Sequence, residues 1–500
     1  MENLANLAQG FADLATPLSL FWCITGVVIG TLIGALPGLG PVAGIAILMP
    51  LGYTLDTVPA LTLLMGIYQG AMYGGRISSI LINVPGEPSD VVTAFEGYPL
   101  TRQGRAGYAL SLSAIASFAG GTMGFIGLVL LMPYVSRWGL RFGAPEMFAL
   151  MLFALVSTSG LGQKNMWRGL IALGIGLVIS VIGIDRISGE VRVSFGTVEL
   201  WDGVNFIAVA VGLFGLSEAM VLLREKQEEQ AFPHIRLIDL VPGLRDLARN
   251  VGAVCRGAVL GYLIGVLPGA GATIATFMSY GIEKRLSKTP QRFGTGVEQG
   301  LTAPEAASNA SIGGSLVPLF TLGIPSGAVT AVLLGALITV GLQPGPRMLE
   351  TSGDVIWATI ASLFVANTLL LIINTAFVPF FTTLIRLAQR YLVTVIAALC
   401  VVGVYFVNFQ FFDVGIMLLF GVIGYFMRLC NFPLAPLILS AVLGPLLETN
   451  LRQSLLLSGN SVEIFMTRPI AATLLVASAL ILVLPILRLL WRATRRVALG

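Results

Sequence analysis

Residues 26–40 read Gly-Val-Val-Ile-Gly-Thr-Leu-Ile-Gly-Ala-Leu-Pro-Gly-Leu-Gly, and residues 257–271 read Gly-Ala-Val-Leu-Gly-Tyr-Leu-Ile-Gly-Val-Leu-Pro-Gly-Ala-Gly. In both stretches a glycine recurs at every fourth position before a Leu-Pro-Gly step. Glycines at this spacing let a neighbouring helix approach closely, and the proline stops the helix and frees backbone polar groups. The sequence therefore predicts two copies of one broken helix.

The composition indicates that both copies lie in a membrane. Of the 500 residues, 56% are hydrophobic and 11% are charged, whereas about a quarter of a soluble domain is charged. We expect an all-α polytopic membrane protein with roughly 12 transmembrane helices, some of them half-helices or re-entrant hairpins. Because Lys and Arg are missing before the first apolar stretch, we also expect that this stretch is no cleavable signal.

The chain divides at its most polar stretch. Residues 224–250 combine several arginines with several acids and predict a linker. On either side, residues 1–223 and 251–500 each contain one copy of the broken helix, so we expect two transmembrane repeats in one membrane body.

The charges that flank the two copies predict opposite orientations. The first copy is followed by a turn, Gly52 to Thr57, that carries Asp56 alone, whereas arginines and lysines surround the second copy: Arg245, Arg249, Arg256, Lys284, Arg285, Lys288 and Arg292. Short loops rich in Lys and Arg tend to stay in the cytoplasm. This pattern favours two inverted repeats, with the amino terminus outside and both the linker and the carboxy terminus inside.

A break inside a membrane helix is costly unless it lines a cavity or is packed within protein. Matched breaks in two halves are typical of the midplane site of a secondary transporter, where freed carbonyl oxygens can hold a cation. We therefore assign a cation site to the backbone of the two breaks: Pro37, Gly38, Gly40, Pro268, Gly269 and Gly271. The alternative that these residues only allow tight packing and kinks stays open.

A second matched feature follows each break. Tyr73 to Ser89 and Ser311 to Ser326 both contain a Gly-Gly step, a short apolar run and an apolar residue followed by proline and a small residue. Each is interpreted as a re-entrant hairpin whose tip presents backbone N–H groups, which suit a carboxylate. The predicted substrate site comprises Arg76, Ser78, Ser79, Asn83, Pro85, Gly86, Ser308, Asn309, Gly323, Pro325 and Ser326.

The charged residues of the hairpins admit two interpretations. Arg76 is either a functional intramembrane cation or an arginine that reaches the membrane interface. The flanking acids either carry protons or bind ions, or they are solvated loop residues; they are Glu87, Asp90, Glu96, Glu298 and Glu305.

The assembled motifs resemble the TctA family, the large membrane subunit of tripartite tricarboxylate transporters. The resemblance lies in Gly34-Ala-Leu-Pro-Gly-Leu-Gly40, Tyr73-Gly-Gly75, Asn83-Val-Pro-Gly86, Glu96-Gly-Tyr-Pro99, Gly104-Arg-Ala-Gly107, Gly265-Val-Leu-Pro-Gly-Ala-Gly271, Ala303-Pro-Glu-Ala-Ala307 and Gly323-Ile-Pro325, whose order covers almost the whole chain. The sequence departs from the family pattern at Arg76, where Ser or Thr is usual, and at Ser308, where Asn is usual. Both departures fall in the expected substrate site and leave the identity of the substrate open.

The resemblance implies a multi-pass permease of the bacterial inner membrane, with a periplasmic amino terminus. Such a permease imports tri- or dicarboxylates with a sodium or proton gradient. It works with a small membrane subunit and a periplasmic solute-binding protein, and it uses no cofactor, no nucleic acid and no metal other than a sodium ion. Whether the chain forms a homo-oligomer is left open.

Other functional classes fit the sequence less well. An intramembrane enzyme needs metal ligands or a nucleophile with a base, but the single histidine, His234, lies in the linker and no His-Glu-x-x-His motif occurs, so we expect no enzyme. A passive anion channel or an uncoupled permease remains the alternative, since a pore need not close around one solute at a time. A scaffold would not need two matched breaks.

Overall fold

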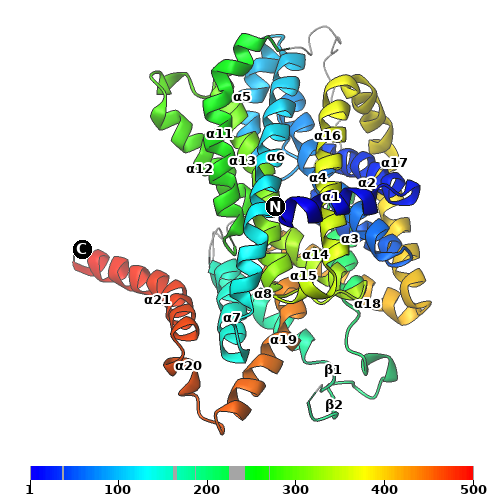
Figure 1. The fold of residues 1–500 in the computed structure, drawn as a ribbon, viewed down its shortest axis with the longest axis vertical. Coiled ribbons are helices and arrows are strands. Elements are labelled where there is room, and N and C mark those ends of the chain that lie inside the picture. The colour runs from blue at the N-terminus through cyan, green and yellow to red at the C-terminus, as the bar shows by residue number, and fades with distance from the viewer. Residues whose placement is uncertain are drawn as a thin grey trace.

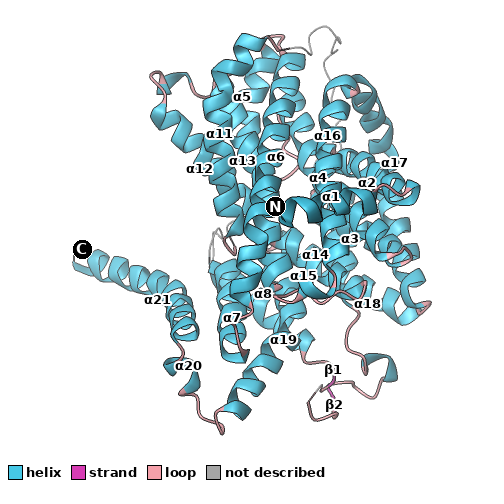
Figure 2. Ribbon diagram, viewed as in Figure 1, coloured by secondary structure: helices cyan, strands magenta, loops and turns pink. Residues whose placement is uncertain are grey.

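The computed structural model describes residues 2–36, 39–160, 166–185, 187–224, 242–269 and 271–498. Most of the predicted linker, residues 225–241, lies outside the described residues, as do Pro37 and Gly38. The described chain is almost entirely helical, with one short pair of antiparallel strands (Figure 2).

The elements before the linker are α1 (Glu2–Leu14), α2 (Pro17–Ala35), α3 (Pro41–Tyr53), α4 (Thr57–Ile82), η1 (Pro88–Asp90), α5 (Val91–Arg102), α6 (Ala106–Gly139), α7 (Ala144–Gly160), α8 (Met166–Ser180), β1 (Gly183–Ile184), β2 (Val191–Arg192), η2 (Val198–Leu200), α9 (Phe206–Ala210), the π-helix η3 (Val211–Leu216) and α10 (Ser217–Arg224). The elements after it are α11 (Leu244–Val266), α12 (Gly271–Leu286), η5 (Pro290–Arg292), α13 (Glu298–Leu322), α14 (Ala328–Thr339), α15 (Met348–Thr351), α16 (Gly353–Ala376), α17 (Val378–Asn408), α18 (Phe411–Leu429), α19 (Ala435–Leu457), α20 (Ile464–Thr467) and α21 (Pro469–Ala498).

Several helices are long and apolar enough to cross a bilayer. Within the described part of the chain there are five: Pro17–Ala35, Ala106–Gly139, Phe206–Arg224, Gly353–Ala376 and Phe411–Leu429. Further apolar helices are shorter, among them α3, α8 and α14. The expectation of an all-helical, multi-pass membrane protein is confirmed, whereas the count of roughly 12 crossings stays a prediction.

The glycine stripes pack α2 against α4 and α11 against α13. A Cβ atom on Gly34 would lie 2.0 Å from the carbonyl oxygen of Ala71, and one on Gly265 would lie 2.5 Å from the carbonyl oxygen of Ser311. The other glycines of both stripes meet the facing helix just as closely. Because any side chain there would collide with a backbone, the stripes hold two matched helix pairs in close contact.

Both broken helices end in the same way. The N–H group of Leu36 donates to the carbonyl of Ile33 at 3.2 Å, and that of Leu267 donates to the carbonyl of Ile264 at 3.0 Å. Both leucines are in extended conformation, and a second helix begins within five residues, at Pro41 and at Gly271.

The hairpins differ from the prediction in their first limb. Residues from Tyr73 and from Ser311 do not start new segments, because α4 and α13 continue unbroken to Ile82 and Leu322. Both helices then stop at a left-handed residue, Asn83 (φ 59°) and Gly323 (φ 68°), which is the usual end of an α-helix. The following proline separates each long helix from the next one, so each hairpin tip joins a full helix to a second, shorter limb.

The two halves interlock around these tips. Helix η1, which follows the first tip, packs against α12, and α14, which follows the second tip, packs against α3. In Figure 1, α6 runs through the centre of the molecule beside α13, while β1 and β2 project at the lower end. Segments of both halves therefore meet at the two tips.

Candidate functional site

A cavity of about 330 Å³ opens at the first hairpin tip. Its wall consists of residues 40–43 after the first break, residues 86–88 of the tip, Phe214 and Glu218 of η3 and α10, and Arg428 with residues 432–435 at the junction of α18 and α19. Both halves of the chain thus line the same cavity. Two residues of the predicted sites, Gly40 and Gly86, lie together in its wall.

Two helices begin at the wall of this cavity. Helix α3 starts at Pro41 and α19 starts at Ala435. The first N–H groups of a helix have no acceptor within the helix and carry partial positive charge. The cavity therefore has two sources of attraction for an anion in its backbone alone.

An arginine adds a full positive charge. Arg428, at the end of α18, pairs with Glu218 of α10, and its Nε donates to Ser217 Oγ at 3.1 Å. The Arg428 side chain keeps 30% of its surface exposed, whereas Glu218 is almost fully buried. The π-helix η3 directly precedes Ser217 and Glu218, and π-turns of this kind often mark functional sites.

Sequence reasoning missed this ion pair. Arg428 closes an apolar helix and resembles an ordinary interfacial arginine, and Glu218 lies in a short amphipathic segment. The π-turn and the contact between α10 and α18 depend on tertiary structure, so the sequence carried no signal for them.

The second hairpin tip is closed. The N–H group of Gly269 donates to the carbonyl of Ser326 at 2.8 Å, which fixes the second break to the second tip. Ser326 is buried, and Ile324 packs with Leu150 and Ala154 of α7. In the described structure, Gly323, Pro325 and Ser326 do not line the cavity, and neither do Pro268, Gly269 and Gly271.

Intramolecular bonds also occupy part of the tip amides. In the first tip the N–H group of Glu87 donates to Asp90 Oδ2 at 3.1 Å, and in the second the N–H group of Gly327 donates to Thr330 Oγ1 at 2.9 Å. Each tip is thus capped by a side chain three residues further on, as at the start of an ordinary helix. These two tip N–H groups are therefore already bonded within the protein.

The remaining predicted substrate residues lie in different surroundings. The hydroxyls of Ser78 and Ser79 donate to the carbonyl of Gly75 at 3.1 and 3.0 Å, as serines in helices commonly do. Asn83 is exposed and Pro85 is partly buried.

On α13, Asn309 Nδ2 donates to the carbonyl of Glu305 at 3.1 Å, while Ser308 Oγ and Asn309 Oδ1 are buried without a partner among the described residues.

Arg76 lies in the protein interior and does not extend to a membrane interface. Its side chain is fully buried, and Nη1 donates to Ser117 Oγ at 2.7 Å and lies 3.7 Å from Glu305 Oε2. The guanidinium group also stacks over the Tyr73 ring at 4.4 Å. The contact with Glu305 links α4 of the first half to α13 of the second.

The flanking acids are bound within the protein. Glu305 accepts hydrogen bonds from the hydroxyls of Thr93 (2.5 Å) and Ser117 (2.8 Å). Glu96 accepts from the N–H groups of residues 294, 296 and 297 and from the Tyr280 hydroxyl, and is fully buried. Glu298 accepts from Tyr108 and pairs with Arg105. None of these three is a freely solvated loop residue.

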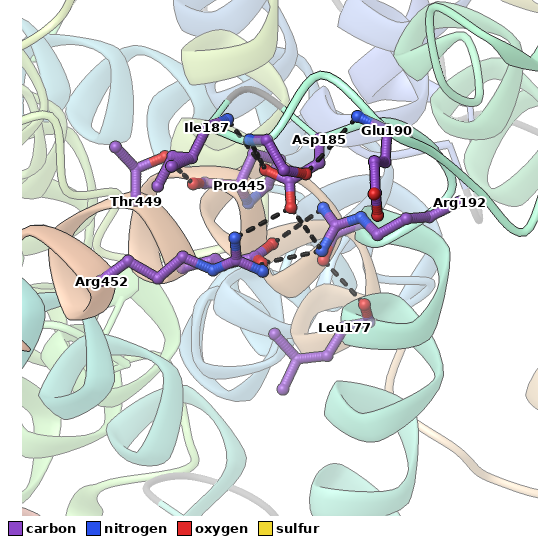
Figure 3. Close-up of polar contacts among 11 residues, drawn as sticks. Leu177, Asp185, Ile187, Glu190, Arg192, Pro445, Thr449 and Arg452 are labelled. Atoms are coloured by element: carbon purple, nitrogen blue, oxygen red, sulfur yellow. Dashed lines mark hydrogen bonds and ion pairs between the residues drawn. The ribbon is translucent and has the colours of Figure 1, made fainter.

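A separate ionic network fixes the β1–β2 hairpin to α19 (Figure 3). Asp185 and Glu448 each pair with both Arg192 and Arg452, at N–O distances between 2.7 and 3.6 Å. The N–H group of Ile187 donates to Asp185 at 2.8 Å, and this bond, the bonds from Ser188 and the charge of Arg192 lower the pKa of the Asp185 carboxyl to about 2. The network holds this loop at the lower end of the molecule in Figure 1.

Comparison with known proteins identifies the family. Residues 20–439 match the model of the tripartite tricarboxylate transporter TctA family. A protein of Agrobacterium vitis described as "Uncharacterized 52.8 kDa protein in TAR-I ttuC' 3'region" is 40% identical over 491 residues, which are 98% of both chains. A second one, "Uncharacterized protein in TAR-II ttuC' 3'region", is 40% identical over 215 residues, which are 43% of this chain and 89% of its own.

No solved structure matches the chain. The family match spans both broken helices, both hairpins and all segments of the cavity wall. The family name denotes a transporter of several components, so partner subunits are implied. This chain belongs to the tripartite tricarboxylate transporter TctA family.

Proposed function

We propose that the chain is the membrane permease that imports small carboxylates, of the tri- or dicarboxylate class, and that a cation gradient drives the import. The observation that carries this proposal is the composition of the cavity wall, where Arg428 stands with the first turns of α3 and α19. An arginine and helix amino termini are the groups that bind carboxylates most effectively in proteins. A volume of about 330 Å³ suits a small organic anion.

Glu218, the ion-pair partner of Arg428, would compete with a substrate carboxylate for the guanidinium group. Glu218 neutralises Arg428 while the cavity is empty of anion, which keeps the cation from being left unpaired in a partly buried place. A substrate carboxylate then competes with Glu218 for the guanidinium group. Phe214 and Phe432 add apolar wall against the carbon skeleton of the substrate.

The matched geometry supports a transporter with two inverted repeats, residues 1–223 and 251–500, joined by the linker 224–250. Both halves have a helix pair held by glycines, a Leu-Pro-Gly break and a capped hairpin tip. One tip borders the cavity and the other is closed. In an alternating-access cycle the two tips would exchange these roles, with the second tip opening toward the opposite side.

The proposed setting follows from the family. The permease lies in the bacterial inner membrane with its amino terminus in the periplasm and its linker and carboxy terminus in the cytoplasm. A periplasmic solute-binding protein delivers the carboxylate, and the small membrane subunit completes the membrane complex. Sodium or protons supply the driving force.

The test is uptake by proteoliposomes that contain the chain with its small membrane subunit. Labelled tricarboxylates and dicarboxylates are offered with the periplasmic binding protein, with and without sodium and proton gradients. Accumulation above the outside concentration, dependent on a gradient, supports a coupled importer. Rapid equilibration that ignores both gradients instead identifies a channel or uncoupled permease, and absence of any carboxylate flux contradicts the proposal.

A further inference from the structure

The first hairpin tip contains two carboxylates, Glu87 and Asp90, that form no ion pair among the described residues. Glu87 lines the cavity, and its N–H group donates to Asp90 Oδ2 at 3.1 Å. Asp90 is buried over Gly75, where an added Cβ would lie 1.9 Å from Asp90 Oδ2. Two acids thus lie side by side, one open to the cavity and one sealed behind it.

The charged groups around this pair already have partners. Arg76 and Glu305 form a buried ion pair, and Arg428 pairs with Glu218 on the cavity wall. From α12, which packs against η1, Glu283 pairs with Arg256. The Tyr68 hydroxyl contacts Ser315 Oγ at 3.5 Å, and the Ser89 hydroxyl donates to Glu87. Neither Glu87 nor Asp90 has a cationic partner of its own among the ion pairs of the described residues.

The second copy of the hairpin shows that capping does not require these acids. Gly327 stands where Glu87 stands in the first copy, and Thr330 caps the second tip in the place of Asp90. A neutral hydroxyl therefore provides the same bond to the tip. A carboxylate is therefore not required for the cap itself.

Arg76 supplies an independent sign that something more is bound here. Its Nε and Nη2 atoms are fully buried and have no partner among the described residues, although Nη1 is bound to Ser117 beside Glu305. Buried donors of this kind usually bind water.

We propose that Glu87 and Asp90 together bind the proton whose movement is coupled to carboxylate transport. Two carboxylates that lie this close in a partly buried place repel each other, which favours protonation of one of them. The substrate anion enters the same cavity that Glu87 lines, and its charge repels an ionised Glu87. Substrate binding therefore takes up a proton from the adjacent solution onto a Glu87 or Asp90 oxygen, and release of the substrate returns it.

A proton suits this place better than a metal ion. Hydroxyl and N–H donors already occupy oxygens of Glu87 and Asp90. A proton needs one oxygen lone pair and no coordination shell.

This inference depends on the proposed carboxylate transport, and the experiment separates the two. Wild-type complex, Glu87→Gln and Asp90→Thr are reconstituted, and exchange of labelled against unlabelled tricarboxylate is compared with accumulation driven by a pH gradient. Asp90→Thr installs the cap of the second copy, so the tip keeps its fold. Glu298→Gln is the matched control, since it neutralises a glutamate of α13 whose contacts are Arg105, Tyr108 and Asn250.

We expect both tip variants to lose at least tenfold of the accumulation driven by pH, a difference of about 1.4 kcal/mol, and to lose far less of the exchange, which needs no net movement of protons. Glu298→Gln should retain both activities. Wild-type accumulation that follows a sodium gradient alone, or tip variants that accumulate substrate like the wild type, would overturn the inference. Absence of exchange in the wild type would instead contradict the carboxylate transport on which it rests.

A binding measurement keeps the test decisive if a variant fails to transport. The affinity of the purified complex for a fully ionised tricarboxylate is measured between pH 7 and pH 9, together with proton uptake reported by an indicator dye in weak buffer. For the wild type, the affinity should fall by up to about tenfold for each unit by which the pH rises. One proton should be taken up for each tricarboxylate bound. In both variants the affinity should be independent of pH and no proton should be taken up. A variant with the same pH dependence as the wild type would refute the assignment.

Discussion

The N–H group of Gly269 donates a 2.8 Å hydrogen bond to the carbonyl oxygen of Ser326. This bond joins the second broken helix to the second hairpin tip, two segments that the sequence places far apart. In the first half the tip also lies against the broken helix, because a Cβ on Gly86 would lie 2.5 Å from the carbonyl oxygen of Gly34. The broken helix and the tip therefore lie in contact in both halves, and of the two tips only the first borders the cavity.

The glycine stripes should be intolerant of alanine. Gly34→Ala and Gly265→Ala each place a methyl group within 2.5 Å of a facing backbone carbonyl, and overpacking of this kind typically costs about 1–3 kcal/mol. We expect a lower midpoint of thermal unfolding in detergent. Gly281→Ala, in α12, has no atom within 4 Å of the new Cβ and serves as the control, which should unfold at the wild-type temperature or above it. Equal unfolding midpoints of the three variants would contradict the close contact of the glycine stripes with the facing helices.

Glu96 should stabilise the loop before α13. Its carboxylate accepts the N–H groups of Gly294, Gly296 and Val297, all at 2.8 Å or less. Glu96→Gln removes the charge from these bonds, and hydrogen bonds to charged groups contribute about 1.5–3 kcal/mol each. We expect a loss of about 2 kcal/mol in stability and faster hydrogen exchange at residues 294–297.

The exposed Glu350→Gln is the control for this prediction. It should change neither the stability nor the exchange rates. Slow exchange at residues 294–297 in Glu96→Gln would show that other contacts hold the loop.

Substitutions of Arg428 and of Glu218 should have opposite effects on the affinity for a carboxylate. Arg428→Gln removes the cation of the cavity and is expected to weaken equilibrium binding by about 10- to 100-fold. Glu218→Gln removes the competitor of the substrate and should tighten it. Titration calorimetry on the membrane complex measures both, with Arg105→Gln, which breaks the exposed pair with Glu298, as the control. Unchanged affinity in Arg428→Gln would place the substrate elsewhere.

The ion pairs of Asp185, which fix the β1–β2 hairpin to α19, should break only in strong acid. The native pKa of this carboxyl is about 2, below the usual value of about 3.9. A lowered pKa means that the contribution to stability is complete above about pH 4 and is lost as the pH falls toward 2. Fluorescence of Trp201, in a chain whose other tryptophans are replaced by phenylalanine, should report this transition.

Asp185→Asn provides the comparison for this transition. It removes the titrating group, so the acid transition of Trp201 should disappear while the signal at neutral pH resembles that of the released loop. An identical acid transition in this variant would assign it to another residue.

The local features near each break were predictable from the sequence. Glycine spacing and the Leu-Pro-Gly steps fix the helix pairs and the breaks, because these effects act over a few residues. The hairpin limbs were partly misread, since Gly74 and Gly75 suggested an interruption. The structure keeps both in α4, where Gly74 packs against the backbone of α2 and Gly75 makes room for Asp90.

The long-range ionic contacts could not be derived from the sequence. Arg76 pairs with Glu305, and Arg428 with Glu218, across more than two hundred residues in each case. Such pairs depend on how helices of different halves cross, and no local pattern records that. The sequence therefore identified Gly40 and Gly86 of the cavity wall but not its arginine.

We place the transported carboxylate in the cavity between the first hairpin tip and the end of α18. The most direct measurement is a structure of the membrane complex determined with a bound tricarboxylate. We expect ligand density in contact with Arg428 and bordered by residues 40–43 and 86–88. Density at another place, with this cavity unoccupied and the Arg428–Glu218 pair unchanged, would contradict it.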